Sequence, residues 1–316
     1  MQTYGIWRTV IVTGVLLMAT FCEAAAIKLG VLPSSDAMLI HVANDEGLFK
    51  AQGLDVEVIP FQSALEVNAA MRANRLDGQY CDVMTVLMQN DRGIKQKLIL
   101  SLTYPKAAQR AFGLAVAPTF AKRYQSLADL DGVQTAMSAN SIIDYLLGRM
   151  IETQALPKGA LRPVEIRQIQ VRLQTVLSGQ MPTAMLPEPF LTMVEAKGGR
   201  VLWDDRQLGE AKSYIALRTS HLTPDTVRGF KRAICEAAKR VAHKPDVYRA
   251  TMVAKRLLPK EAASTFEMLT PEAIDLPQGL PGMATQADVT RMANWLKARR
   301  LIREPVHYDD VVYREE

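Results

Sequence analysis

The sequence predicts an α/β protein with two lobes, each a mainly parallel sheet flanked by helices. Strand-like apolar runs alternate with amphipathic helical segments from Ile27 onward, which is the pattern of a parallel sheet covered by helices. The same order of elements restarts near residue 127. The 316 residues, 48% of them hydrophobic and 22% charged, suffice for two buried cores. We expect one lobe to comprise residues 27–105 and 214–316 and the other residues 106–213.

The first lobe is predicted to begin with a compact apolar strand, a polar turn and a helix. The order of strand and helix then repeats, and the second strand alternates apolar with acidic residues, as a half-buried strand does. The predicted strands are 27–32, 54–60, 79–81 and 97–104, and the predicted helices are 38–49, 66–75 and 83–90.

The second lobe is predicted to follow a crossing segment at 105–110. Its strands are expected at 111–117, 133–137 and 184–186, with a helix at 142–151. Two prolines that flank Glu188 end the last of these strands. A strand at 214–217 should return the chain to the first lobe, where Thr223 caps a long helix and Thr285 caps a final one.

The first 26 residues are predicted to be a secretory signal peptide. After Arg8 comes an uncharged run at 9–21 that is too short to span a bilayer, and small residues follow at 24–26. Cleavage after residue 24 or after residue 26 fits this pattern. The bulky Phe21 argues against lipoprotein anchoring at Cys22, and a retained N-terminal anchor is the alternative. We therefore expect a periplasmic protein.

Composition argues against several other classes. The net charge is +5, and the 38 basic residues are scattered among 33 acidic ones, which does not favour nucleic-acid binding. The four histidines lie far apart, and the chain has no P-loop or GxSxG motif, so we predict no metal, no cofactor and no enzymatic activity. Cys81 and Cys235 could pair in an oxidising compartment, but we predict two buried free thiols.

Polar corners at the ends of predicted strands form the candidate binding site. The carboxyl ends of parallel strands meet at one edge of a sheet, where ligands of open α/β folds bind. At nearly the same spacing in the two lobes, these corners hold Ser34, Ser35, Asp36 and Asp82 in the first and Ser138, Asn140, Ser141 and Glu188 in the second. Further candidates are Gln62 and Ser63, which follow the second strand, and Tyr104, which could stack on a planar ligand.

The chemistry of these corners points in two directions. Helix N-termini with nearby hydroxyl and amide groups can hold a polar or anionic ligand, although the same residue types are ordinary helix caps. The carboxylates of Asp36, Asp82 and Glu188 would instead repel an anion and would pair with a ligand that carries hydrogen-bond donors. Asp82 could also only cap the helix that begins at Val83, and Pro-Glu-Pro could only be a rigid helix start.

Several runs resemble those of the solute-binding proteins of ABC importers, of the nitrate, sulfonate, taurine and thiamine-pyrimidine-precursor type: EGLFKAQGLDVEV, SLADLDGVQTAMSANSIIDYLL, LSGQMPTAMLPEPFLTMVEAKGGRVLWDD and GFKRAICEAAKRVAHKPD. The resemblance implies a type II periplasmic binding fold with a ligand cleft between the lobes, in which the four corners face the ligand. It also implies a monomer that captures a small molecule by lobe closure and delivers it to a membrane permease with a cytoplasmic ATPase.

The acidic corners favour a nitrogen-bearing heterocycle, such as a thiamine pyrimidine precursor, as the ligand. A small oxyanion, either a sulfonate or nitrate, is the first alternative. Two further alternatives are a fold-related enzyme of pyrimidine synthesis and a component that presents its ligand to a membrane sensor.

Overall fold

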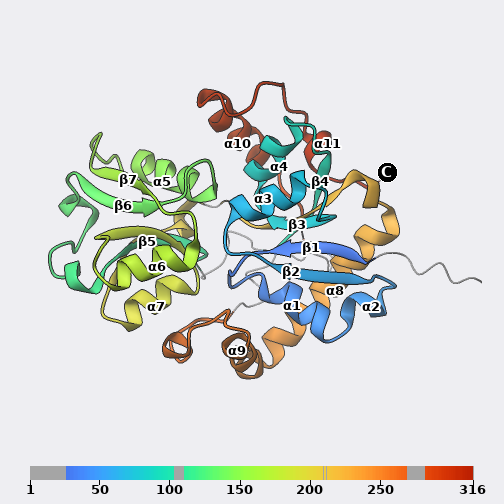
Figure 1. Ribbon diagram of the computed structural model, residues 1–316, viewed down its shortest axis with the longest axis horizontal. Coiled ribbons are helices and arrows are strands. Elements are labelled where there is room, and N and C mark those ends of the chain that lie inside the picture. The colour runs from blue at the N-terminus through green and yellow to red at the C-terminus, as the bar shows by residue number, and fades with distance from the viewer. Residues whose placement is uncertain (1–25, 103–109, 209, 211, 269–281, 316) are drawn as a thin grey trace, which may run out of the picture.

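The computed structural model describes residues 26–102, 110–208, 210, 212–268 and 282–315. Three features expected from the sequence lie outside these residues: the signal peptide up to residue 25, Tyr104, and most of the crossing segment at 105–110. Two five-stranded sheets, each with its own helices, form the two lobes seen side by side in Figure 1.

The first sheet has the strand order β2-β1-β3-β10-β4. Strand β1 pairs parallel with β2 and β3, whereas β10 lies antiparallel between β3 and β4. The strands are β1 (Ile27–Val31), β2 (Val56–Pro60), β3 (Gly78–Cys81), β4 (Gln96–Ser101) and β10 (Tyr214–Arg218).

The second sheet repeats this plan with the order β7-β6-β8-β5-β9. Strand β6 pairs parallel with β7 and β8, and β5 lies antiparallel between β8 and β9. The strands are β5 (Phe112–Val116), β6 (Val133–Met137), β7 (Leu161–Glu165), β8 (Thr183–Pro187) and β9 (Arg200–Asp204). Each sheet is thus mainly parallel, and in each the fourth strand runs the opposite way.

The antiparallel strands are the ones that enter a lobe from its neighbour. Strand β5 follows the first crossing and β10 follows the second, so each runs away from the other lobe, whereas the parallel strands run towards it. Strand β10 returns the chain to the first sheet, in agreement with the prediction for 214–217. The lobe boundaries at residues 105 and 213 stay a prediction.

Helices cover both sheets (Figure 1). The helix predicted at 38–49 is divided in two, because Gly47 has a left-handed backbone (φ 68°) and ends the first part. The helices are α1 (Met38–Asp45), α2 (Leu48–Ala51), α3 (Ala64–Arg72), α4 (Val83–Asn90), α5 (Ile142–Thr153), α6 (Ile169–Leu177), α7 (Phe190–Ala196), α8 (Pro224–His243), α9 (Pro245–Ala254), α10 (Gln286–Ala298) and α11 (Tyr308–Val311). In the described part of the chain no helix combines the length and hydrophobicity needed to cross a bilayer.

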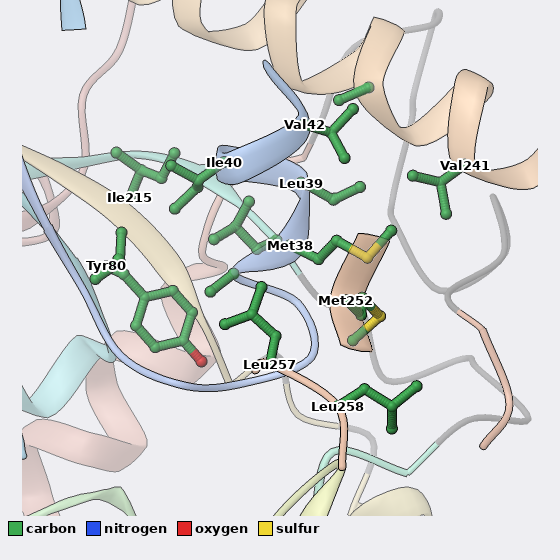
Figure 2. Packing of buried hydrophobic residues seen from close by; sticks show 14 of the residues in the cluster. Met38, Leu39, Ile40, Val42, Tyr80, Ile215, Val241, Met252, Leu257 and Leu258 are labelled. Carbon is green, nitrogen blue, oxygen red and sulfur yellow. The ribbon is translucent and has the colours of Figure 1, made fainter. Parts of the chain in front are cut away.

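The long helix α8 packs its apolar stripe on the N-terminal helices of the first lobe. The rings of Phe49 and Phe230 lie 5.0 Å apart between centroids, and both side chains are buried. Figure 2 shows Met38 of α1, Val241 of α8 and Met252 of α9 in the same apolar cluster. Cys81 and Cys235 are buried free thiols, which confirms the prediction from the sequence.

Candidate ligand-binding cleft

A cavity of about 70 Å³ lies where the two lobes meet. Its walls come from the carboxyl ends of strands and the N-termini of helices in both lobes, including Ser34, Asn68 and Asp82 from the first lobe and Ser138, Ile142 and Arg172 from the second. This volume holds on the order of five water-sized groups. The cavity therefore suits a small, compact ligand.

The predicted site residues divide into two groups. Ser34, Asp82, Ser138 and Ser141 line the cavity. Among the described residues, those that form its walls do not include Ser35, Asp36, Gln62, Ser63, Asn140 or Glu188. Ligand contact by residues of this second group stays a prediction.

Ser35 and Glu188 nevertheless connect the two predicted corners. The backbone N–H of Ser35 donates to the carbonyl oxygen of Glu188 at 3.1 Å. The backbone N–H of Ile169 donates to the carbonyl oxygen of Gln62 at 3.4 Å, which makes a second bond between the lobes. The lobes are therefore in contact on both sides of these corners.

Asp36 is buried and accepts hydrogen bonds from hydroxyl groups around it. Ser34 Oγ donates to Oδ1 at 2.5 Å, Tyr80 Oη donates at 3.0 Å, and Ser213 Oγ donates to Oδ2. Its side chain is 3% exposed. Burial of the Tyr80 side chain, and then the nearby negative charge of Asp36, raise the pKa of Tyr80 well above its usual range. The phenol therefore stays protonated and donates. The sequence led us to expect that a ligand would donate to the Asp36 carboxylate. In the structure, protein hydroxyl groups make these bonds instead.

Glu188 is likewise bonded within the second lobe. Its Oε1 accepts from Arg110 Nε at 2.6 Å, and its Oε2 accepts from Thr192 N at 3.2 Å. Burial raises the pKa of this carboxyl group, and the adjacent Arg110 opposes that effect. The carboxylate supports the start of α7.

Gln62, Ser63 and Asn140 have roles in local structure. Ser63 caps α3 by accepting from Glu66 N at 3.3 Å, and Gln62 N donates back to Glu66 Oε2 at 3.0 Å. Asn140 has a left-handed backbone (φ 56°), and its N–H donates to Asp144 Oδ2 at 3.0 Å.

Asp82 caps α4 and also faces the second lobe. Its Oδ1 accepts from Thr85 N at 2.7 Å, as the alternative interpretation of the sequence proposed. Burial raises the pKa of Asp82, while the N–H groups of Thr85 and of Ile142, at the start of α5, lower it. The carboxylate thus lies at the N-terminus of a helix from each lobe.

The N-terminus of α5 forms part of the second-lobe wall, next to the Asp82 carboxylate. Ser141 precedes the helix, but its hydroxyl donates to Ser138 O at 2.7 Å and makes no capping bond. Ile142 and Ile143, the first two helical residues, line the cavity. Their backbone N–H groups and the helix dipole favour negative charge at this point.

Sequence reasoning missed the cations of the site. Arg172 is 1% exposed and lines the cavity; its Nη1 donates to Ile166 O at 2.8 Å, and its Nε has no partner among the described residues. Lys212, buried at the return crossing, and the exposed Arg167 also form part of the wall. Arg172 falls on the apolar face of α6 with Ile169, Leu173 and Val176, and a charged residue on a buried face is the signal that could have found it.

The cavity wall carries more cationic than acidic side chains. Three of its lining side chains are cationic, and Asp82 alone is acidic among the described residues that form the wall. Burial lowers the pKa of Arg172 to about 10, so the guanidinium stays protonated at neutral pH. A buried charge whose Nε–H lacks a partner is costly, and an anionic ligand would supply that partner.

Protonation of Asp82 should strengthen the binding of an anion. Because the pKa of Asp82 is raised, lowering the pH from 7 neutralises this carboxylate before an ordinary aspartate, and one negative charge leaves the cavity. We expect affinity for a permanently ionised sulfonate to rise up to about tenfold between neutral and mildly acidic pH, the equivalent of one pKa unit. The Asp82→Asn variant keeps a side chain that can cap α4. Titration calorimetry should show that its sulfonate affinity depends less on pH than that of the wild type. If affinity changes with pH equally in both proteins, Asp82 does not cause the pH dependence.

The two sheets of matching order and the cavity between them form the two-lobed fold of the type II periplasmic binding proteins. The chain belongs to the NMT1-like family, whose model matches residues 22–257. No curated protein matches it by sequence.

Solved structures share the fold at low identity. The alkanesulfonate-binding protein SsuA of Xanthomonas axonopodis pv. citri, bound to MOPS, is 17% identical, with a TM-score of 0.77 over 93% of this chain and 99% of that one. The aliphatic sulphonate-binding protein SsuA of Escherichia coli is 15% identical, with a TM-score of 0.74 over 92% of each chain. The nitrate-binding protein NrtA of Synechocystis is 14% identical, with a TM-score of 0.62 over 76% of this chain and 69% of that one. The resemblance and the fold class expected from the sequence are thereby confirmed.

Proposed function

We propose that this protein is the extracytoplasmic solute-binding component of an ABC importer and that its ligand is a small oxyanion such as a sulfonate. The observation that carries the choice of ligand is Arg172, a fully buried guanidinium whose Nε–H faces no acceptor among the described residues. A sulfonate or a similar planar or tetrahedral anion in the cavity would pair with this guanidinium.

The rest of the wall supports the same ligand class. The dipole of α5 and the hydroxyl of Ser138 favour negative charge. Phe112, Ile142 and Ile169 supply apolar surface that would pack against a short carbon chain. The small volume favours a compact head group with a short chain over a large ring system.

A nitrogen-bearing heterocycle fits this wall less well. That expectation rested on three carboxylates, but Asp36 and Glu188 are bonded to protein donors and lie outside the residues that line the cavity. The cations Arg172 and Lys212 would also repel a protonated amine. We therefore place the small oxyanion, the first alternative from the sequence, ahead of the heterocycle.

The transport role rests on the family and on the fold. Structures that share this fold include one described as the ligand-binding component of an ABC-type import system and two described as periplasmic. By analogy, we propose a periplasmic protein that closes on its ligand as a monomer and presents it to a membrane permease with a cytoplasmic ATPase.

A ligand screen on the mature chain tests the proposed ligand. We expect methanesulfonate, ethanesulfonate or nitrate at about 100 times its dissociation constant to stabilise the protein by about 2.7 kcal/mol. Such stabilisation would raise the melting temperature by roughly 5–10 °C. Aminopyrimidines and simple amines should give no shift. If an aminopyrimidine shifts the transition and all the oxyanions fail, the proposed ligand class is wrong.

A further inference from the structure

Three glutamine side chains form a closed hydrogen-bonded ring behind the cavity. Gln79 on β3, Gln89 on α4 and Gln96 on β4 are 0%, 4% and 0% exposed. Gln79 Nε2 donates to Gln96 Oε1 at 2.7 Å, Gln96 Nε2 donates to Gln89 Oε1 at 2.5 Å, and Gln89 Nε2 donates to Gln79 Oε1 at 3.4 Å. Each amide therefore both donates and accepts within the ring.

The ring meets the cavity at Gln79, which lines it, and connects to a second lining residue, Asn68. Gln89 Nε2 donates to Asn68 Oδ1 at 2.6 Å, and Asn68, carried by α3, lines the cavity. With its oxygen occupied by the ring, Asn68 keeps its Nδ2 group, which has no protein partner among the described residues. Asn68 can thus offer its two N–H donors to a ligand, while Gln89 takes up one of the two lone pairs of its oxygen.

The direction of the ring decides which atom Asn68 presents. If all three amides were reversed, Gln89 would turn its oxygen to Asn68, and Asn68 would have to donate to the ring and expose its own oxygen. Gln79 Nε2 makes a second bond, to Gln89 Oε1 at 2.9 Å, so two hydrogen bonds join Gln79 and Gln89. Burying three amides costs free energy unless every group is bonded, so the ring is stable only as a complete unit.

We propose that Asn68 is a specificity-determining donor of the binding site and that the ring of Gln79, Gln89 and Gln96 positions its amide. This inference rests on the proposed oxyanion ligand. A donor at this point selects anions whose oxygens only accept, such as a sulfonate, over anions that carry a protonated oxygen, such as a phosphonate monoanion. A phosphonate monoanion would have to turn its P–O–H away from Nδ2, which leaves it fewer binding orientations than a sulfonate has.

Affinities for methanesulfonate and for the methylphosphonate monoanion test the proposal in mildly acidic buffer. We expect Asn68→Leu to weaken methanesulfonate binding by about 10- to 100-fold, the usual loss of a hydrogen bond to a charged group. Asn68→Asp, which replaces Nδ2 by an acceptor, should shift the ratio of the two affinities about tenfold towards methylphosphonate. Asp82 is present in every variant, so its contribution cancels in that ratio.

A double-mutant cycle tests the role of the ring. Gln89→Met removes the donor to Asn68 while keeping a side chain of similar size, and we expect methanesulfonate affinity to fall by about three- to tenfold. In the Asn68→Leu background the same change should have no effect, because Gln89 acts through Asn68. Asn90→Leu is the matched control: it removes a bond from α4 to the carbonyl oxygen of Gln96 but leaves the ring amides intact, so the affinity ratio should not change.

The outcomes separate this inference from the proposed function. If the wild-type protein binds neither methanesulfonate nor any other oxyanion, the proposed function fails. If it binds methanesulfonate but Asn68→Leu and Asn68→Asp leave both affinities unchanged, the role of Asn68 is wrong and the proposed function stands. Equal effects of Gln89→Met with and without Asn68 would show that the ring acts only on stability.

Discussion

Replacing Arg172 by methionine should weaken methanesulfonate binding by about 2–5 kcal/mol, or roughly 30- to 5,000-fold. The reason is that Arg172 is the buried charge whose Nε–H the ligand would satisfy. The same variant should be as stable as the wild type without ligand, or more stable, because an unpaired buried charge is replaced by apolar volume. Loss of the bond to Ile166 O offsets part of that gain by about 1 kcal/mol. Calorimetric titration measures the first effect and thermal unfolding the second.

Arg167→Met is the matched control for Arg172. Both arginines line the cavity, but the Arg167 side chain is 53% exposed and already bonded to Glu165 at 2.5 Å. We expect its replacement to change methanesulfonate affinity by less than about fivefold, as is usual for an exposed charge. If Arg172→Met binds as tightly as the wild type, or if Arg167→Met loses more affinity than Arg172→Met, the buried guanidinium is not the anchor of the anion.

Replacing Glu188 by alanine should destabilise the protein by about 3 kcal/mol and change methanesulfonate affinity by less than about threefold. The change removes the acceptor of Arg110 Nε at 2.6 Å and leaves the buried N–H and hydroxyl of Thr192 without their bonds to the carboxylate. A loss of this size should lower the melting temperature by roughly 5–10 °C. Thermal unfolding at neutral pH measures it.

Glu195→Ala provides the comparison for Glu188. Glu195 bonds the same arginine at 2.5 Å, but its side chain is 41% exposed, so its loss should cost no more than about 1 kcal/mol. A Glu188→Ala protein with an unchanged melting temperature and an affinity tens of times weaker would move Glu188 into the binding site. That result would restore the interpretation in which its carboxylate contacts the ligand.

The fold could be predicted from sequence patterns because those patterns are local. Alternation of strands and helices, the prolines around Glu188 and the caps at Asp82, Thr223 and Thr285 all act within a few residues, and the structure has each of them in place. The antiparallel strands β5 and β10 were not expected, because strand direction depends on how the chain crosses between lobes.

The character of the site could not be predicted in the same way. Asp36, Asp82 and Glu188 look like a set of acidic corners in the sequence, yet two of them bond to partners far along the chain. Ser213 lies 177 residues from Asp36, and Arg110 lies 78 residues from Glu188. Arg172 looks like one charge within an amphipathic helix until the neighbouring lobe closes the cavity around it.

The sequence alone therefore determined the class of fold, the internal repeat and the corners where strands end and helices begin, since short-range periodicity and capping specify these features. Only the tertiary structure decided the sign of the charge at the cavity. The partners of a buried charge are set by distances in space, and these partners determine whether a carboxylate is neutralised by the protein or a guanidinium is left for a ligand.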